Sequence, residues 1–194
     1  TIAQYPLVQE AVADILVEVY AGTASSFALA AMLDKIETDS ASDADHATYR
    51  MFVNMNKYIT SIRASEAIHR AIEVLGGNGA IESFSILPRL YRDMIVLESW
   101  EGTHNVLCLQ VLRDCARYHL HQPFRAYLDS LLDSPHESLN EAAATVLEAL
   151  STGIARLESL IADPASPRAQ AHIRRVIDQL ADVAQAALLV NEAT

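Results

Sequence analysis

The chain has 194 residues, of which 51% are hydrophobic and 20% are charged. This is the length of about one to one and a half typical domains, enough to bury a core without disulfides or a structural metal. Two cysteines are too few for a disulfide scaffold and fit a reducing, cytoplasmic compartment. No run approaches the roughly 18 consecutive apolar residues of a membrane-spanning helix, so we expect no transmembrane segment.

The formal net charge is −11, from 14 basic and 25 acidic residues. Residues 1–45 hold one basic residue and eight acidic ones, and residues 121–194 hold five and ten. Residues 46–120 hold eight and seven, so an anionic ligand is expected there. No segment has the basic excess that direct binding to nucleic acid or to an anionic membrane requires.

Glycine and proline are sparse, and the long segments between them indicate an all-α protein. Apolar residues recur at helical spacing from Pro6 to about Glu37, although Gly22 should weaken this helix locally. The small polar stretch 39–46 predicts a loop, and a second long helix is expected from Ala47 to about Leu75. Glycine and asparagine tolerate positive φ, so the sequence Gly76-Gly77-Asn78-Gly79 ends that helix.

The rest of the chain predicts further helices. Residues 80–100 are irregular or form a short helix with Pro88 in its first turn. A third main helix is expected from Glu101 or Gly102 to about His121, where Pro123 interrupts it. A short helix is expected over residues 124–132.

Two amphipathic helices complete the pattern: the first has apolar positions from Leu139 to Ile161, the second has them from Ile173 to Leu188, and residues 163–167 form the turn between them. The turn between them is short, which predicts an antiparallel pair. A helical bundle is the natural packing for such a sequence. The expected division is a bundle of residues 1–121 and a helical extension of residues 122–194 that packs on it.

No metal or disulfide site is expected. Cys108 and Cys115 lie seven residues apart on one predicted helix, about 10 Å along its axis, which is too far for a disulfide. They are better interpreted as buried core thiols. His119 and His121 are two residues apart and would face different sides of a helix, so a zinc pair is improbable.

Residues 71–113 carry three motifs in order: a helix ending in LGGNG, the pair Arg92-Asp93, and the sequence WEGT from Trp100 to Thr103. Their order and spacing resemble the C-terminal helical domain of the acyl-CoA dehydrogenase family, over residues 1 to about 120. The resemblance implies an up-down four-helix-bundle-like domain with an additional C-terminal helical pair. The tail from residue 121 onward and the sequence WEGTHNVLCLQVLR resemble the bacterial alkylation-response branch of that family more than its short-chain members.

Glu101 is the candidate catalytic residue. From position alone it is an acid that complements a helix dipole. The resemblance implies instead a base that removes the α-proton of an acyl-CoA thioester while the β-hydrogen leaves as hydride to FAD. An ordinary carboxylate is a weak base for a C–H bond, so burial beside Trp100 is expected to raise its pKa. Trp100 either fills a core or forms a wall of the acyl pocket, and Gly102 would let the substrate approach closely.

The glycines Gly76, Gly77 and Gly79 form either a simple helix end or part of a cofactor site. The resemblance implies that their backbone amides approach the pyrophosphate of FAD bound by a neighbouring subunit, in a homo-oligomer that is a dimer or a tetramer. Thr103 and Asn105 fall where residues of the family help to hold the flavin. Glu73 stands where the family has glutamine, and its carboxylate would oppose a pyrophosphate.

The pair Arg92-Asp93 and the residue His104 each allow two interpretations. Arg92 and Asp93 each need a partner other than one another, and they either form surface ion pairs or order the site. His104 is either solvated or functional.

Enzymes of the family also contain an N-terminal helical domain and a middle β-domain, which hold most of the flavin contacts. The 194 residues are therefore expected to be a domain of an FAD-dependent acyl-CoA dehydrogenase that is inactive alone. One alternative is a domain of an alkylation-response-type flavoprotein, although the acidic tail argues against direct DNA binding. The other is a non-catalytic helical oligomerisation module with relic motifs, which an intact Glu101 argues against.

Overall fold

The computed structural model describes all 194 residues and contains helices, turns and loops but no strands. The predicted all-α class is confirmed. The seven α-helices are α1 (Pro6–Glu37), α2 (Asp43–Leu75), α3 (Leu87–Ser99), α4 (His104–Tyr118), α5 (His121–Leu131), α6 (Asn140–Ile161) and α7 (Pro167–Glu192). Three short 3-10 helices cover Ile2–Gln4, Gly76–Ala80 and Glu137–Leu139.

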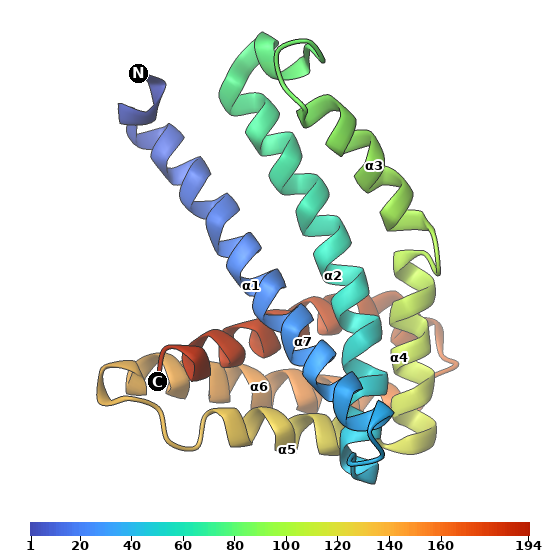
Figure 1. Cartoon of the computed structure of the whole chain (residues 1–194). Coiled ribbons are helices and arrows are strands. Elements are labelled where there is room, and N and C mark those ends of the chain that lie inside the picture. Colours follow the sequence, from blue (N-terminus) through green and yellow to red (C-terminus); the bar gives the residue numbers. More distant parts are fainter.

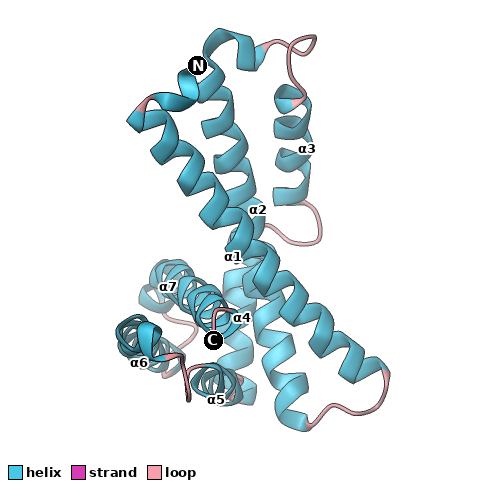
Figure 2. Ribbon diagram, turned by 60° about the vertical axis from the view of Figure 1, so that its left-hand side comes forward, coloured by secondary structure: helices cyan, strands magenta, loops and turns pink.

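The helices form two groups that cross one another. Helices α1 and α2 run antiparallel, and α3 followed by α4 returns along α2 (Figure 1). Helices α5, α6 and α7 lie across the lower half of this group, and a view from the side shows them together against it (Figure 2). The upper half therefore consists of α1, α2 and α3 alone.

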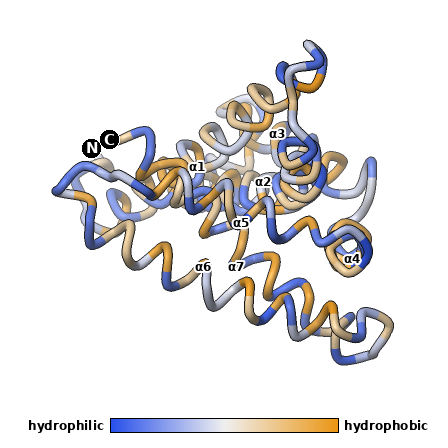
Figure 3. The backbone as a smooth tube through the Cα atoms, turned by 90° about the horizontal axis from the view of Figure 1, so that it is seen from below, coloured by the Kyte–Doolittle hydropathy of each residue, from blue (hydrophilic) through white to orange (hydrophobic).

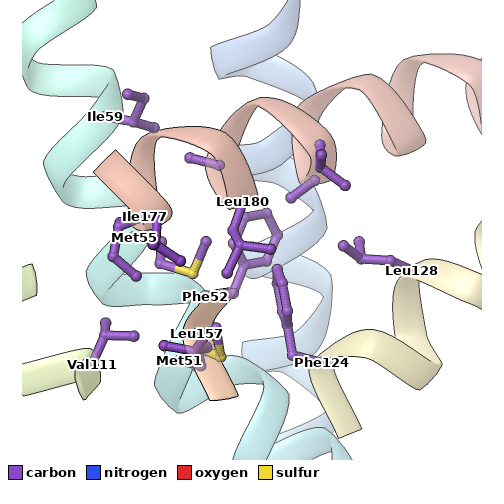
Figure 4. Close-up of a cluster of buried hydrophobic side chains, with 14 of the residues drawn as sticks. Met51, Phe52, Met55, Ile59, Val111, Phe124, Leu128, Leu157, Ile177 and Leu180 are labelled. Carbon is purple, nitrogen blue, oxygen red and sulfur yellow. The ribbon is translucent and has the colours of Figure 1, made fainter. Parts of the chain in front are cut away.

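One hydrophobic core joins the two groups. Phe52 of α2 packs against Phe124 of α5, with ring centroids 5.9 Å apart. Leu157 of α6 and Ile177 of α7 lie in the same cluster (Figure 4). The cluster thus includes residues from both sides of the predicted boundary at residue 121, and α7 contacts α1, α2 and α4 directly. The division into two domains stays a prediction.

The predicted antiparallel pair is present as α6 and α7 (Figure 1). Hydrophobic and hydrophilic positions alternate along both helices, as their amphipathic pattern requires (Figure 3). Ser166 caps α7 by accepting a hydrogen bond from the Ala169 amide, and Pro167 follows in the first turn. At Gly153 of α6, an added Cβ would lie 2.7 Å from Leu180 Cδ2, so the absence of a side chain lets the two helices approach closely.

Arg63 of α2 ties three helices together in the middle of the molecule. Its guanidinium pairs with Glu18 of α1 at 3.3 Å and with Asp182 of α7. It also donates a hydrogen bond of 3.0 Å to Gln185 Oε1. Burial opposes the charge of Arg63, but its ion pairs raise its pKa overall. This junction fixes where α7 crosses α1 and α2.

Helix α1 is continuous through Gly22, where an added Cβ would meet Thr60 of α2 at an ordinary 3.5 Å. It is the one helix long and apolar enough to qualify as a candidate membrane span. Soluble core helices satisfy the same criteria, and α1 packs against α2 and α7 in the bundle. Several of its apolar side chains are exposed, among them Leu7 and Phe27.

The structure corrects several predicted helix ends. The predicted loop 39–46 is wrong for its last four residues, because Ser42 and Asp45 form a capping box that starts α2 at Asp43. The third main helix ends at Tyr118 because His119 adopts a left-handed φ of 56°. Pro123 is accommodated in the first turn of α5, where no intrahelical N–H bond is lost.

Candidate functional site

The candidate base lies in the turn that joins α3 to α4. Trp100 is the extended C-cap of α3, and Thr103 is the N-cap of α4. Between them, Glu101 has φ of 54° and Gly102 has φ of 114°. A left-handed conformation costs a residue with a Cβ about 1–2 kcal/mol, so the surroundings must hold Glu101 there. The predicted start of this helix at Glu101 or Gly102 is therefore wrong by two or three residues.

The side chains of this turn are more exposed to solvent than the sequence predicts. Glu101, Thr103 and Asn105 are all exposed, and Trp100 is 57% exposed. Glu101 is thus not buried beside Trp100, because the turn carries both side chains away from the core. Any desolvation of this carboxylate needs a substrate, a cofactor or another part of a protein to cover it.

A cavity of about 760 Å³ begins beside the turn and runs along α2. It lies between α2, α3, α4 and α7, and it extends from Glu98 and His104 to Glu73, three residues before Gly76. Its two ends thus come close in the chain to the predicted cofactor-binding segments, but none of the predicted cofactor residues lines it. The lining is polar and comprises Ile62, Ser65, Glu66, His69, Arg70, Glu73, Tyr91, Glu98, His104 and Arg174.

His104 belongs to a hydrogen-bonded cluster at one end of this cavity. Its Nε2 lies 3.4 Å from Ser61 Oγ and 3.9 Å from Glu98 Oε2, and Ser65 donates a hydrogen bond to the same carboxylate. The ring meets the Tyr58 ring edge-on at 5.4 Å. Burial lowers the pKa of His104, which favours its neutral form. His104 is therefore a packed member of the cavity wall and not a solvated side chain.

Tyr58 continues the cluster into the C-terminal extension. Its hydroxyl donates a hydrogen bond to Asp178, and Arg174 Nε donates one of 2.9 Å to the same hydroxyl. The Arg174 guanidinium also lies over the Tyr58 ring, 5.5 Å from its centroid. Burial and the Asp178 carboxylate raise the pKa of Tyr58, so the phenol stays protonated.

A second cavity, of about 320 Å³, lies between α2 and α3 and reaches Trp100 of the turn. Trp100 and Lys57, which lies in the middle of α2, both form part of its wall. Trp100 is therefore a cavity residue and not a core residue. The full lining is Lys57, Thr60, Ser61, Ala64, Met94, Leu97 and Trp100.

The three glycines predicted to bind the cofactor differ in whether the local structure requires glycine at their position. Gly76 has φ of 60° and ends α2. Gly79 is buried, and an added Cβ would lie 2.4 Å from the Ile72 carbonyl oxygen. Gly77 is exposed, and an added Cβ would meet nothing within 4 Å. The helix end thus explains Gly76 and Gly79, whereas nothing within the chain requires glycine at position 77.

Arg92 and Asp93 each have a partner other than one another, as predicted. Arg92 pairs with Glu82 at 2.5 Å, and Asp93 pairs with Arg89 at 3.8 Å. All four side chains are largely exposed, so these pairs contribute little to stability by themselves. The Arg92 pair does connect α3 to the segment that follows Gly79.

The two cysteines lie in the core. Burial raises the pKa of Cys108 and of Cys115 to about 12, which makes both thiols unreactive. This agrees with their interpretation as core residues. No group of three or more potential metal ligands occurs in the structure.

Sequence reasoning missed Lys57, Tyr58, Arg174 and Asp178. They lie on helices far apart in the chain and belong to no local motif. Lys57 carried a weak signal, because it is one of only two lysines in the chain.

Comparisons with known proteins show the family to which the sequence is similar. Residues 1–115 match the family model described as acyl-CoA dehydrogenase, C-terminal domain. The putative acyl-CoA dehydrogenase AidB of Escherichia coli (strain K12) is 38% identical over 111 residues, which are 57% of this chain and 19% of that protein. Acyl-CoA dehydrogenase family member 11 of Caenorhabditis elegans is 26% identical over 201 residues, covering 100% of this chain and 32% of that protein.

Solved structures share the fold. The crystal structure of C. elegans ACDH-11 in complex with C11-CoA superposes with a TM-score of 0.86 at 26% identity, over 98% of this chain and 33% of that one. The apo form of Bd2924 has a TM-score of 0.74 at 23% identity, which concerns the fold alone. This chain spans about a fifth to a third of the length of the relatives it matches.

Proposed function

The chain belongs to the acyl-CoA dehydrogenase family, and on this basis we propose that it supplies the catalytic base for FAD-dependent α,β-dehydrogenation of an acyl-CoA thioester. One observation carries the proposal. Neighbours of Glu101 in the chain line both cavities: Glu98 and His104 line the polar cavity, and Trp100 lines the smaller one. The Glu101 carboxylate is itself exposed, so a ligand that occupies either cavity and extends over this turn can reach it.

Glu101 would remove the α-proton of the thioester. Its carboxylate is exposed, so a bound substrate and the protein that covers it would provide the desolvation that strengthens a carboxylate base. Trp100 would form a wall for the acyl group, and Gly102 would allow close approach. FAD, when bound, supplies the acceptor for the β-hydrogen as hydride. The crystal structure of the C. elegans relative contains C11-CoA, which supports an acyl-CoA substrate class.

The residues of this chain fit a share of a flavin site. The polar cavity is of the size of small-molecule and cofactor pockets, and Arg70 and Arg174 line it as cations. Thr103 makes no side-chain cap to α4, so the first N–H groups of that helix remain available to a ligand. The carboxylate of Glu73 in the same wall opposes a pyrophosphate there.

Two segments of the chain would contact FAD. Gly76, Gly77 and Gly79 would present backbone amides to FAD bound by a neighbouring subunit, and Gly77 fits this best because its surface is open. Thr103 and Asn105 would hold the flavin at the start of α4. These contacts require a homo-oligomer, which we propose to be a dimer or a tetramer in the cytoplasm.

The remainder of the site would come from other protein. The chain covers a third or less of its relatives, and we propose that it does not catalyse dehydrogenation by itself. Exposed apolar side chains on α1 and α3, such as Leu7, Phe27 and Val96, support further protein contacts there.

A second candidate is a domain of an alkylation-response-type flavoprotein. It is favoured by the 38% identity to AidB and by the WEGTHNVLCLQVLR segment. The same proton abstraction would apply in that protein. The ten acidic and five basic residues of 121–194 oppose DNA binding by this tail. A helical oligomerisation module without catalysis is the weaker alternative, because it would not need Glu101.

The test is acyl-CoA-dependent bleaching of flavin in a polypeptide where this chain follows the preceding domains of the C. elegans relative. Glu101→Gln should keep flavin bound and slow bleaching by a factor of about 100 or more, because general base catalysis is removed. The matched control is Glu137→Gln, which removes an acid far from the turn. Equal bleaching rates in the Glu101 variant and the wild type would reject Glu101 as the base.

A further inference from the structure

Lys57 is the one side chain from another helix that reaches the turn of Glu101 with hydrogen bonds. It lies on α2, and its Nζ donates to the Gly102 carbonyl oxygen at 2.7 Å and to the Glu98 carbonyl oxygen at 3.3 Å. These two carbonyls flank Glu101 in the chain. A single ammonium group thus holds both ends of the segment that bears the candidate base.

Neither carbonyl oxygen accepts a hydrogen bond from a backbone N–H group within a helix, so Lys57 is the donor that satisfies both. Glu98 lies in the last turn of α3, where carbonyl groups have no intrahelical donor. Gly102 precedes the N-cap of α4, so its carbonyl lies outside that helix. A cation at a helix C-terminus is also favoured by the helix dipole. Lys57 therefore satisfies the end of one helix and the approach to the next.

The turn has little else to hold it. Glu101 and Gly102 both have positive φ, and Thr103 makes no side-chain cap. The remaining bonds at its edges are the Trp100 amide to Val96 and the Leu107 amide to Thr103, which belong to the flanking helices. Without Lys57, no bond from the rest of the chain fixes the left-handed backbone of Glu101.

Charge links Lys57 to the same turn. Burial lowers the pKa of Lys57, while the carboxylates of Glu101 and Glu98 raise it. His104 also faces this group, since the charge of Lys57 lowers the pKa of that imidazole. The ammonium thus lies within electrostatic range of the candidate base, of Glu98 and of His104, on which Arg174 also acts as a cation.

We propose that Lys57 is a positioning residue, whose two hydrogen bonds hold the turn in the conformation that presents the Glu101 carboxylate. The inference rests on the proposed role of Glu101, because a held turn matters for catalysis only if its carboxylate acts. Its structural content can be tested in the 194-residue chain without flavin or thioester. A failure here is therefore distinguishable from a failure of the proposed dehydrogenation.

The chain provides its own reporters for this test. Trp100 is the single tryptophan, and it adjoins Glu101. Lys57→Met should lower the fluorescence anisotropy of Trp100 and change its near-ultraviolet circular dichroism. It should also speed hydrogen exchange of the Trp100 and Leu107 amides by about tenfold, as expected for the loss of a hydrogen bond to a charged group. Lys57→Arg should bring the anisotropy, the circular dichroism and the exchange rates most of the way back to those of the wild type, because it keeps a cationic donor.

The matched control is Lys35→Met, which removes the other lysine, at the end of α1. It should leave Trp100 unchanged. A folded Lys57→Met variant, verified by far-ultraviolet circular dichroism, with wild-type Trp100 signals and exchange rates would overturn the proposal.

A second measurement avoids dependence on the folding of that variant. With two lysines, the side-chain nuclear magnetic resonance signal of Lys57 can be assigned by comparison with Lys57→Arg. In Glu101→Gln the pKa of Lys57 should fall, because a nearby negative charge that raises it is removed. An unchanged pKa would show that Lys57 does not face Glu101, and the proposal would fail.

Discussion

The phenol of Tyr58 on α2 donates a hydrogen bond to the carboxylate of Asp178 on α7, which lies 120 residues later in the chain. Tyr58 follows Lys57 directly and packs edge-on against His104. The C-terminal extension is thus bonded to the same turn of α2 that holds the Glu101 segment. This contact gives α7 a direct structural connection to the candidate site.

The first prediction concerns that hydrogen bond. Tyr58→Phe should reduce the free energy of unfolding by about 1–3 kcal/mol, because Asp178 and Arg174 lose a partner in a largely buried place. Urea denaturation measures the change. Tyr127→Phe is the matched control, since the hydroxyl of this half-buried tyrosine makes no hydrogen bond within the chain. If both variants lose the same free energy of unfolding, the hydrogen bond from Tyr58 to Asp178 does not contribute to stability and the prediction is wrong.

The second prediction concerns acid stability. His121 is 3% exposed, its Nδ1 has no hydrogen-bond partner, and its Nε2 lies 4.0 Å from Glu158. Burial lowers the pKa of His121 below its ordinary value of 6.5, with an opposing effect from Glu158 and a smaller lowering by His119. In acid the unfolded chain therefore binds a proton that the folded chain resists, so the free energy of unfolding falls as pH drops below about 6.5.

Removing the imidazole should flatten this dependence. His121→Leu should reduce the loss of unfolding free energy between about pH 7.5 and pH 5.5 by an amount on the order of 1 kcal/mol. His104 contributes in the same direction and keeps part of the slope. His172→Gln, at an exposed position on α7, should leave the slope as in the wild type. Denaturation curves at several pH values decide between these outcomes.

The third prediction separates two glycines of the same turn. Gly79→Ala should destabilise the chain by roughly 1–3 kcal/mol, because its Cβ would lie 2.4 Å from the Ile72 carbonyl and the backbone must shift. Gly77→Ala should be neutral or slightly stabilising, since its Cβ meets nothing. If Gly77 adjoins a cofactor, its alanine variant should instead weaken flavin retention in the longer polypeptide. Normal stability and normal retention together would remove Gly77 from the site.

The fourth prediction concerns the chain by itself. After incubation with FAD and gel filtration, the purified 194 residues should be colourless, because they supply only part of the proposed flavin site. The visible absorption spectrum measures this directly. A retained flavin with a perturbed spectrum would contradict the prediction and would mean that the polar cavity holds the cofactor without other domains.

Local signals made the helices and the family predictable. The three motifs lie within residues 71–113, and Pro88, Pro167 and the glycines after Leu75 mark helix ends through backbone geometry that a sequence displays. The predicted loop before α2 is wrong at its end because Ser42 and Asp45 form the capping box of that helix and Asp43 lies in its first turn. Polar composition alone does not distinguish a loop from a helix start.

The geometry of the site was not predictable in the same way. Helical periodicity assigns Lys57 to a face of α2, but its partners Glu98 and Gly102 depend on how α3 and α4 return along that helix. The exposure of Glu101 likewise depends on two successive positive φ values, of which only the one at Gly102 has a sequence signal. Contacts between distant segments follow from the packing and not from any short motif.

The uneven placement of the core has a consequence for motion. Residues 6–20 of α1 and 66–75 of α2 contain no buried residue, whereas the remaining part of each helix contributes buried residues to the core. We therefore expect the amides of the buried part of each helix to exchange more slowly than those of the part without buried residues. Because each helix has one continuous backbone, a partner that docks on the upper ends would protect them from exchange without contacting the core.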